Sequence, residues 1–198
     1  RITEIFHSLQ GEGLYTGLRT VFVRLTGCPL RCRYCDTAYA FKGGTWLSID
    51  QILAEVAQHG SLYVTVTGGE PLAQKGCLEL LSALCDAGYQ VSLETGGALD
   101  VAPVDGRVVK VLDLKTPASG EMAKNLYGNL EHLTPADQLK FVICDRADYE
   151  WARWQVVQRR LERRCAVLFS AAAGELPADR LADCILRIRA RNRSWRRL

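Results

Sequence analysis

Three cysteines stand within eight consecutive positions, with the spacing C-x3-C-x2-C formed by Cys28, Cys32 and Cys35. Thiolates are the protein ligands of iron–sulfur clusters, and three thiolates on a four-iron cubane leave one iron open to bind and activate a further ligand. A structural zinc site is the alternative, but it needs a fourth nearby Cys or His. The next cysteine is Cys77, and neither His7 nor His59 stands at zinc-finger spacing. The triplet therefore favours a [4Fe–4S] cluster over a zinc module in an interaction protein.

Five further cysteines are scattered through the chain: Cys77, Cys85, Cys144, Cys165 and Cys184. A disulfide framework would spread its cysteines more evenly in a smaller, loop-rich chain. We therefore interpret these five as small core hydrophobes. The cysteine usage as a whole indicates a reducing, cytoplasmic compartment.

A second candidate element is the glycine pair in Gly68-Gly69-Glu70, which follows the β-rich run at residues 63–67. Glycines permit a positive φ and close approach of the backbone to a ligand, and a carboxylate can pair with an ammonium group. Taken alone, this segment is equally typical of an ordinary turn.

The elements that must position these residues alternate along the chain. Strands are expected at residues 21–25, 63–67, 91–94, 108–112, 138–143 and 166–169, and helices at residues 48–59, 77–87, 147–163 and 178–187. Such alternation indicates a parallel sheet with helices outside it. Six strands are too few for a closed eight-stranded barrel. We therefore predict an α/β fold of the incomplete (partial) β/α barrel type, with about six parallel strands, in a single domain spanning residues 1–198.

Polar residues recur just past the predicted strand ends, where parallel α/β folds place their active sites. Cys28 follows the first strand, Gly68 the second and Ser170 the last. The third strand ends at Glu94-Thr95, and Asp113-Leu114-Lys115 ends the fourth.

The composition is that of an ordinary soluble protein, with 48% hydrophobic and 24% charged residues and a net charge of +3. No apolar run is long enough to span a membrane, and the first residues have no apolar signal core. Much of the basic excess lies in an atypical tail, residues 187–198. A nucleic-acid patch is one interpretation of such a tail. A solvated tail is the ordinary one, and we expect no nucleic-acid or membrane partner.

The cysteine triplet, with the aromatic Tyr34 before its last cysteine, resembles the motif of the radical S-adenosylmethionine (SAM) superfamily. In that superfamily SAM chelates the open iron through its amino and carboxylate groups. One electron from the cluster then cleaves SAM to methionine and a 5′-deoxyadenosyl radical, so that the cofactor supplies the hard chemistry. The Gly-Gly-Glu segment resembles the superfamily motif that holds the amino group of SAM.

Most of the chain resembles one family more narrowly, the 7-carboxy-7-deazaguanine synthases of queuosine biosynthesis. The segments that carry the resemblance are residues 8–13, 23–28, 35–37, 67–71, 93–95 and 113–115. The resemblance implies ring contraction of 6-carboxy-5,6,7,8-tetrahydropterin to 7-carboxy-7-deazaguanine with loss of ammonia, through hydrogen abstraction at C6. It also implies SAM used catalytically, a Mg²⁺ ion, a homodimer, and an electron donor such as flavodoxin or ferredoxin.

Roles for individual residues follow from this resemblance. The implied pterin-binding residues are Leu9, Gln10, Gly11, Glu12, Arg24 and Thr67. Without the resemblance, we would interpret residues 10–12 as a surface turn. Arg24 is a lone charge in an apolar strand and needs a partner. That partner is either an internal acid or the substrate carboxylate, whose geometry a guanidinium matches.

The metal and SAM contacts are implied in the same way. Thr37 would coordinate Mg²⁺, which prefers oxygen ligands; on its own it would be a turn or cap threonine. The implied SAM-binding residues are Tyr34, Cys35, Asp36, Gly68, Gly69, Glu70, Glu94, Lys115, Thr116, Pro117 and Ser170. Glu94 and Lys115 could also be ordinary loop charges.

The C-terminal part departs from the family pattern. Ala171 stands where members usually have proline, and residues 187–198 are too charged for the apolar strand that usually ends the chain. A C-terminal substrate contact therefore cannot be transferred to this chain. The alternative function is that of an activating enzyme for glycyl-radical enzymes, which shares the cysteine spacing. Cys35-Asp36-Thr37 and the pair Gln10 and Glu12 favour the pterin enzyme.

Overall fold

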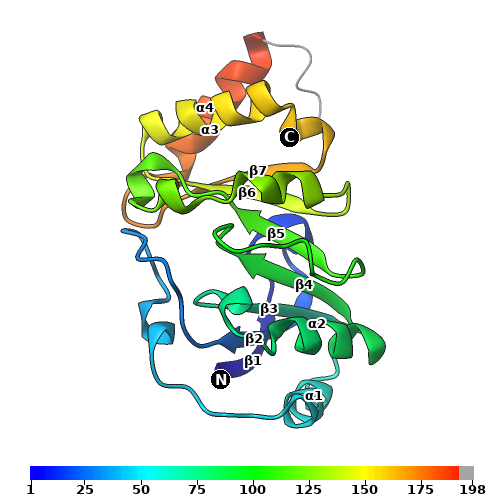
Figure 1. The fold of residues 1–198 in the computed structure, drawn as a ribbon. Coiled ribbons are helices and arrows are strands. Elements are labelled where there is room, and N and C mark those ends of the chain that lie inside the picture. The colour runs from blue at the N-terminus through cyan, green and yellow to red at the C-terminus, as the bar shows by residue number, and fades with distance from the viewer. Residues whose placement is uncertain (192–198) are drawn as a thin grey trace.

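One seven-stranded sheet, with its strands in chain order, is the frame of the protein in a computed structural model (Figure 1). The structure describes residues 1–191, with side chains as far as Arg187. The strands are β1 (Ile2–Leu9), β2 (Arg19–Leu25), β3 (Tyr63–Gly68), β4 (Gln90–Thr95), β5 (Val109–Asp113), β6 (Gln138–Ile143) and β7 (Ala166–Ala171). All six predicted strands are present, within two residues of their predicted ends.

Strands β2 to β7 are parallel, which confirms the predicted architecture of six parallel strands. Strand β1 was not predicted. It runs antiparallel to β2, with Leu9 opposite Arg19, and forms one edge of the sheet. Its residues are mostly half-buried or exposed, which left no strong apolar alternation in the sequence. Strands β1 and β7 are not paired, so the barrel is incomplete in the part of the chain that the structure describes.

The four predicted helices are also found: α1 (Ile49–Gln58), α2 (Cys77–Asp86), α3 (Arg146–Arg159) and α4 (Ala178–Arg191). Ser48 caps α1 in a capping box with Gln51. Helix α3 ends earlier than predicted, because Arg160 adopts a left-handed conformation with φ of 52° before a short 3-10 turn. Helix α4 continues past its predicted end, and the prediction for residues 192–198 lies outside the described residues.

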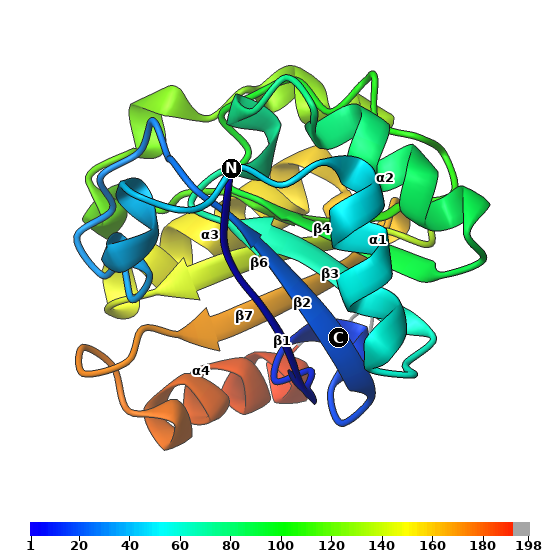
Figure 2. The ribbon, with the colours of Figure 1, turned by 90° about the horizontal axis from the view of Figure 1, so that it is seen from below.

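The helices pack on the sheet from outside. Helix α2 contacts β4, α3 contacts β6 and α4 contacts β7. In Figure 2, α1 and α2 lie together at one side of the sheet, and α4 lies beside β7 at the other. No helix follows β4, and only 3-10 turns connect β5 to β6. None of the described helices is long and apolar enough to cross a membrane.

The strands divide their side chains between two faces with period two. Apolar residues such as Val64, Val66, Leu93 and Phe141 are fully buried in the core between sheet and helices. The alternate residues point to the other face and are mostly polar, for example Thr67 on β3 and Lys140 on β6. The inner face of the sheet is therefore a polar chamber, and the site lies there.

Candidate active site

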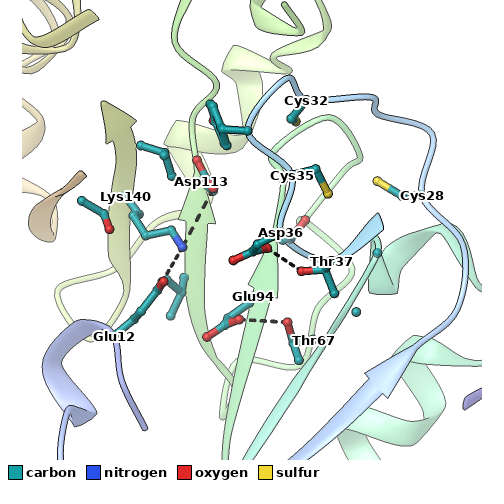
Figure 3. Close-up of a pocket in the computed structure, with 18 of the residues that line it drawn as sticks. Glu12, Cys28, Cys32, Cys35, Asp36, Thr37, Thr67, Glu94, Asp113 and Lys140 are labelled. Atoms are coloured by element: carbon teal, nitrogen blue, oxygen red, sulfur yellow. Dashed lines mark hydrogen bonds and ion pairs between the residues drawn. The ribbon is translucent and has the colours of Figure 1, made fainter. Parts of the chain in front are cut away.

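The ends of the parallel strands bring most of the predicted site residues to one cavity of about 420 Å³. The predicted residues that line it are Gln10, Gly11, Glu12, Arg24, Cys28, Cys32, Tyr34, Cys35, Asp36, Thr37, Thr67, Gly68, Gly69, Glu94, Lys115 and Ser170. Figure 3 draws 18 residues of this cavity, and the ten that it labels come from the cysteine loop, the first loop and four strands. This is the face on which parallel α/β proteins place their active sites.

Four predicted residues do not line the cavity. Leu9 is 61% exposed at the end of β1, Thr116 is fully buried and Pro117 is exposed, and none of the three lines the cavity. The hydroxyl of Thr116 lies 3.0 Å from both the carbonyl oxygen of Val142 and Oδ2 of Asp148, which share its one proton as acceptors. The SAM contacts expected of Thr116 and Pro117 and the pterin contact expected of Leu9 stay predictions.

Glu70, the fourth, is fully buried beneath the cysteine loop. Burial raises the pKa of its carboxyl group, while hydrogen bonds to it oppose that shift. The donors are the backbone N–H of Gly96 at 2.7 Å, the Thr95 hydroxyl at 2.9 Å and the backbone N–H of Leu72 at 3.1 Å. Here Glu70 braces the loops around the cavity, and its contact with the SAM amino group stays a prediction.

The glycine pair after β3 has a local structural reason. Gly68 has a φ of 156°, and a Cβ atom on Gly69 would overlap the carbonyl oxygen of Gly27 and lie 2.9 Å from the Cβ of Cys28. The backbone N–H of Glu70 donates to the same Gly27 oxygen at 2.7 Å. Glycine at position 69 therefore lets the turn after β3 pack directly against the start of the cysteine loop.

The cysteine loop fits an iron–sulfur cluster. Cys28, Cys32 and Cys35 are half-buried on one cavity wall, and the sulfur atoms of Cys28 and Cys35 turn toward each other in Figure 3. Burial raises the pKa of the Cys28 and Cys32 thiols, and nearby Cys35 raises both further. Such thiols are neutral until iron displaces their protons.

A mononuclear site fits less well. Within residues 1–191, no three His, Cys, Asp or Glu side chains converge closely enough to hold one metal ion. A cubane places its three thiolates on three separate irons, so it needs them around a pocket and not at one point. His7 and His59 stack on each other, with ring centroids 5.8 Å apart, and neither lines the cavity.

Two oxygen-bearing side chains follow the last cysteine. The hydroxyl of Thr37 donates to Oδ1 of Asp36 at 2.6 Å, and both residues line the cavity (Figure 3). Hard cations such as Mg²⁺ take oxygen ligands and keep several waters. This pair therefore has the donor chemistry for the predicted ion.

Arg24 has the internal partner that the sequence left open. Its Nε donates to Oε1 of Glu4 on β1 at 2.7 Å, and its guanidinium lies 5.8 Å from the ring centroids of Phe6 and Tyr39. It also lines the cavity. The structure thus provides the ion pair of the plainer interpretation and places the same side chain where a substrate carboxylate could meet it.

Several lining residues had no predicted role, and two of them carry charge: Lys140, and Asp113, which was noted only at the end of the fourth predicted strand. The ammonium of Lys140 lies 2.5 Å from Oε2 of Glu12 and 4.0 Å from Oδ2 of Asp113 (Figure 3). Lys115 lies 2.9 Å from that same Asp113 oxygen. A signal for Lys140 was present: like Arg24, it is a lone cation in an apolar strand.

Comparison with known proteins agrees with the geometry. Residues 22–163 match the radical SAM superfamily. The chain is 50% identical over 176 residues to the 7-carboxy-7-deazaguanine synthase of Koribacter versatilis, covering 87% of this chain and 77% of the relative. It is 44% identical over 191 residues to the enzyme of that name from Chlorobaculum tepidum, covering 95% and 87% of the two chains.

A solved structure agrees in fold. The crystal structure of QueE from Escherichia coli superposes with a TM-score of 0.76 and 24% identity, covering 96% of this chain and 90% of that chain. The expected radical SAM fold is therefore confirmed. So is the expected cofactor pair, since a [4Fe–4S] cluster and SAM define the superfamily. Both the superfamily match and the two close relatives show that this chain belongs to the 7-carboxy-7-deazaguanine synthase family of radical SAM enzymes.

Proposed function

We propose that this chain converts 6-carboxy-5,6,7,8-tetrahydropterin to 7-carboxy-7-deazaguanine, with loss of ammonia, as a step of queuosine biosynthesis. Two observations carry the proposal. The chain is 50% identical to a 7-carboxy-7-deazaguanine synthase, and its cysteine loop faces a cavity whose other wall is polar and charged. A cavity of about 420 Å³ suits a small molecule.

When bound, the cluster and SAM supply a 5′-deoxyadenosyl radical that takes and later returns a hydrogen atom. The residues of this chain orient the pterin for that exchange. Gln10 and Glu12 offer an amide and a carboxylate to the donors and acceptors of the pterin edge. The outer nitrogens of Arg24 form a fork suited to the 6-carboxylate. Thr67, whose hydroxyl donates to Glu94 at 2.8 Å, supports the opposite side.

A Mg²⁺ ion at Thr37 and Asp36 would hold substrate oxygens in place while the ring contracts. The hydroxyl and carboxylate oxygens there supply one or two protein ligands, a number typical for this ion. The proposal includes one domain for residues 1–198, because every described strand belongs to one sheet.

The partners and setting are proposed on related grounds. A small reductant protein such as flavodoxin or ferredoxin would supply the electron, and the chain would act as a homodimer. All eight cysteines are unpaired, which agrees with the reducing cytoplasm.

An anaerobic assay tests the function. Reconstituted protein is mixed with 6-carboxytetrahydropterin, SAM, Mg²⁺ and a chemical reductant, and 7-carboxy-7-deazaguanine is detected by mass spectrometry. We expect many turnovers for each SAM molecule. Stoichiometric consumption of labelled SAM without deazaguanine would instead indicate an activating enzyme for a glycyl-radical partner.

A further inference from the structure

Lys140 is a largely buried cation that the proposed roles do not use. It lies in the middle of β6, between Leu139 and Phe141, which are fully buried on the outer face of the sheet. Its own side chain is 14% exposed and points into the cavity. A charge so little hydrated needs an anion beside it.

Glu12 is the anion in close contact. Its Oε2 lies 2.5 Å from Nζ of Lys140. Asp113 is 4.0 Å away and is already engaged by Lys115. Although burial opposes it, the charges of Asp113, Glu12 and Glu94 raise the pKa of Lys140, so the side chain stays cationic at neutral pH.

Glu12 depends on this contact for its position. Its side chain is 49% exposed, and among the side chains that the structure describes, as far as Arg187, its carboxylate hydrogen bonds only to Lys140, through Oε2. Glu94, on the same cavity, repels it, as the effect of Glu12 in raising the pKa of Glu94 indicates. Without Lys140, repulsion and solvation would both favour a Glu12 rotamer turned out to water.

The loop that carries Glu12 is tied to the same strand. The backbone N–H of Leu14 donates to Oε1 of Gln138 at 2.8 Å, and Gln138 precedes Lys140 on the inner face of β6. The pair formed by Glu12 and Lys140 also lines a second cavity of about 510 Å³, between this loop, β7 and α4. The pair is therefore part of the wall between the active-site cavity and its neighbour.

We propose that Lys140 is a positioning residue for substrate binding, which fixes the Glu12 carboxylate against β6 and leaves Oε1 free for the donors of a pterin edge. This inference rests on the proposed function, and it goes beyond that function by assigning Lys140 a role through Glu12. Lys140 does not itself need to touch the substrate.

A thermodynamic cycle tests the assignment. The affinity of oxidised 6-carboxypterin, a fluorescent ligand that does not turn over, is measured for wild type, Lys140→Met, Glu12→Gln and the double variant. We expect Lys140→Met to weaken binding roughly tenfold or more, the size of a charge-assisted contact. In the Glu12→Gln background the same change should cost less than about twofold, because coupled residues are not additive.

Lys110→Met is the matched control. Lys110 is also buried, 5% exposed, and pairs with Asp137 at 3.1 Å, but it does not line the cavity. The Lys110→Met variant should have a lower melting temperature and an unchanged pterin affinity. The affinity for SAM should be unchanged in both lysine variants. Should Lys140→Met fail to fold, Lys140→Gln replaces it in the cycle.

Two results would overturn the inference, and they differ from each other. A wild-type protein that neither binds nor converts the pterin overturns the proposed function together with the role of Lys140. Normal wild-type turnover, with additive losses in the double variant or equal losses of SAM and pterin affinity, overturns the role of Lys140 alone.

Discussion

Arg24 can be tested for two roles, substrate recognition and internal ion pairing, because its guanidinium is placed for both. Nε is bound to Glu4 at 2.7 Å. Among the described residues, the two terminal nitrogens of Arg24 make no hydrogen bond with protein. Its side chain is 16% exposed and that of Glu4 is 39% exposed. The perturbations that distinguish the two roles are Arg24→Lys and Glu4→Gln.

The expected losses of pterin affinity in the two variants differ enough to distinguish the two roles. Arg24→Lys keeps the charge but removes the planar fork, so a bidentate contact to a carboxylate is lost. A charge-assisted hydrogen bond contributes about 1.5–3 kcal/mol, or roughly tenfold to a hundredfold in affinity. Glu4→Gln removes a partly exposed ion pair, whose contribution is at most about 1 kcal/mol. It should reduce pterin affinity less than about fivefold.

The assay compares 6-carboxypterin with the same pterin lacking the carboxylate. Arg24→Lys should weaken the first strongly and the second little, with SAM affinity and cluster content unchanged. Equal losses for both pterins, together with a lower melting temperature, would refute the substrate contact. They would assign Arg24 to the Glu4 pair and leave the carboxylate anchor unidentified.

Three further predictions follow from the same geometry. Alanine at Cys28, Cys32 or Cys35 should abolish the cluster absorption near about 400 nm and SAM cleavage. The controls Cys77→Ala and Cys165→Ala should change the melting temperature only. Loss of the cluster in either control would contradict the three-thiolate site. Thr37→Ala should raise the Mg²⁺ concentration needed for half-maximal activity while SAM affinity is kept; an unchanged titration would remove Thr37 from the metal site. Although burial opposes it, hydrogen bonds from Arg24 and Tyr39 lower the pKa of Glu4. A carboxyl group whose pKa is lowered by folding stabilises the fold at pH values above its ordinary pKa. That stabilisation is lost as the pH falls through the lowered pKa. The difference in melting temperature between wild type and Glu4→Gln should therefore shrink between about pH 5 and pH 3, and a constant difference would show that the pair is not formed.

The parallel core could be predicted from the sequence because its strands are short runs rich in β-branched and other apolar residues, separated by helical patterns and followed by polar residues at their ends. The cysteine spacing then placed the cluster, since ligand chemistry is local in the chain. Strand β1 was not readable, because an edge strand with half-exposed side chains has no strong alternation. Missing β1 also meant missing Glu4, and with it the partner of Arg24.

Lys140 and Glu12 show a second limit. They are separated by 128 positions in the chain, and only the curvature of the sheet brings the first loop across to β6. Local patterns can flag each charge as unusual, but they cannot pair charges that different strands bring together. Glu70 is similar: its sequence motif suggested a ligand for an ammonium group, whereas its carboxylate accepts hydrogen bonds from Leu72 in its own segment and from Thr95 and Gly96 at the end of β4.

Internal pairing of the cavity cations is consistent with substrate binding. Among the described residues, three cations line the cavity, and each has a carboxylate partner: Arg24 pairs with Glu4, Lys140 with Glu12, and Lys115 with Asp113. A buried cation without an anion would destabilise the protein whenever the cavity held only water. Each of these ion pairs occupies only part of the hydrogen-bonding capacity of its cation and its carboxylate. The remaining N–H groups and oxygen atoms can therefore bind a ligand. For Arg24 the ion pair and the substrate contact are therefore compatible, because Nε orients the guanidinium while the terminal nitrogens bind the incoming carboxylate.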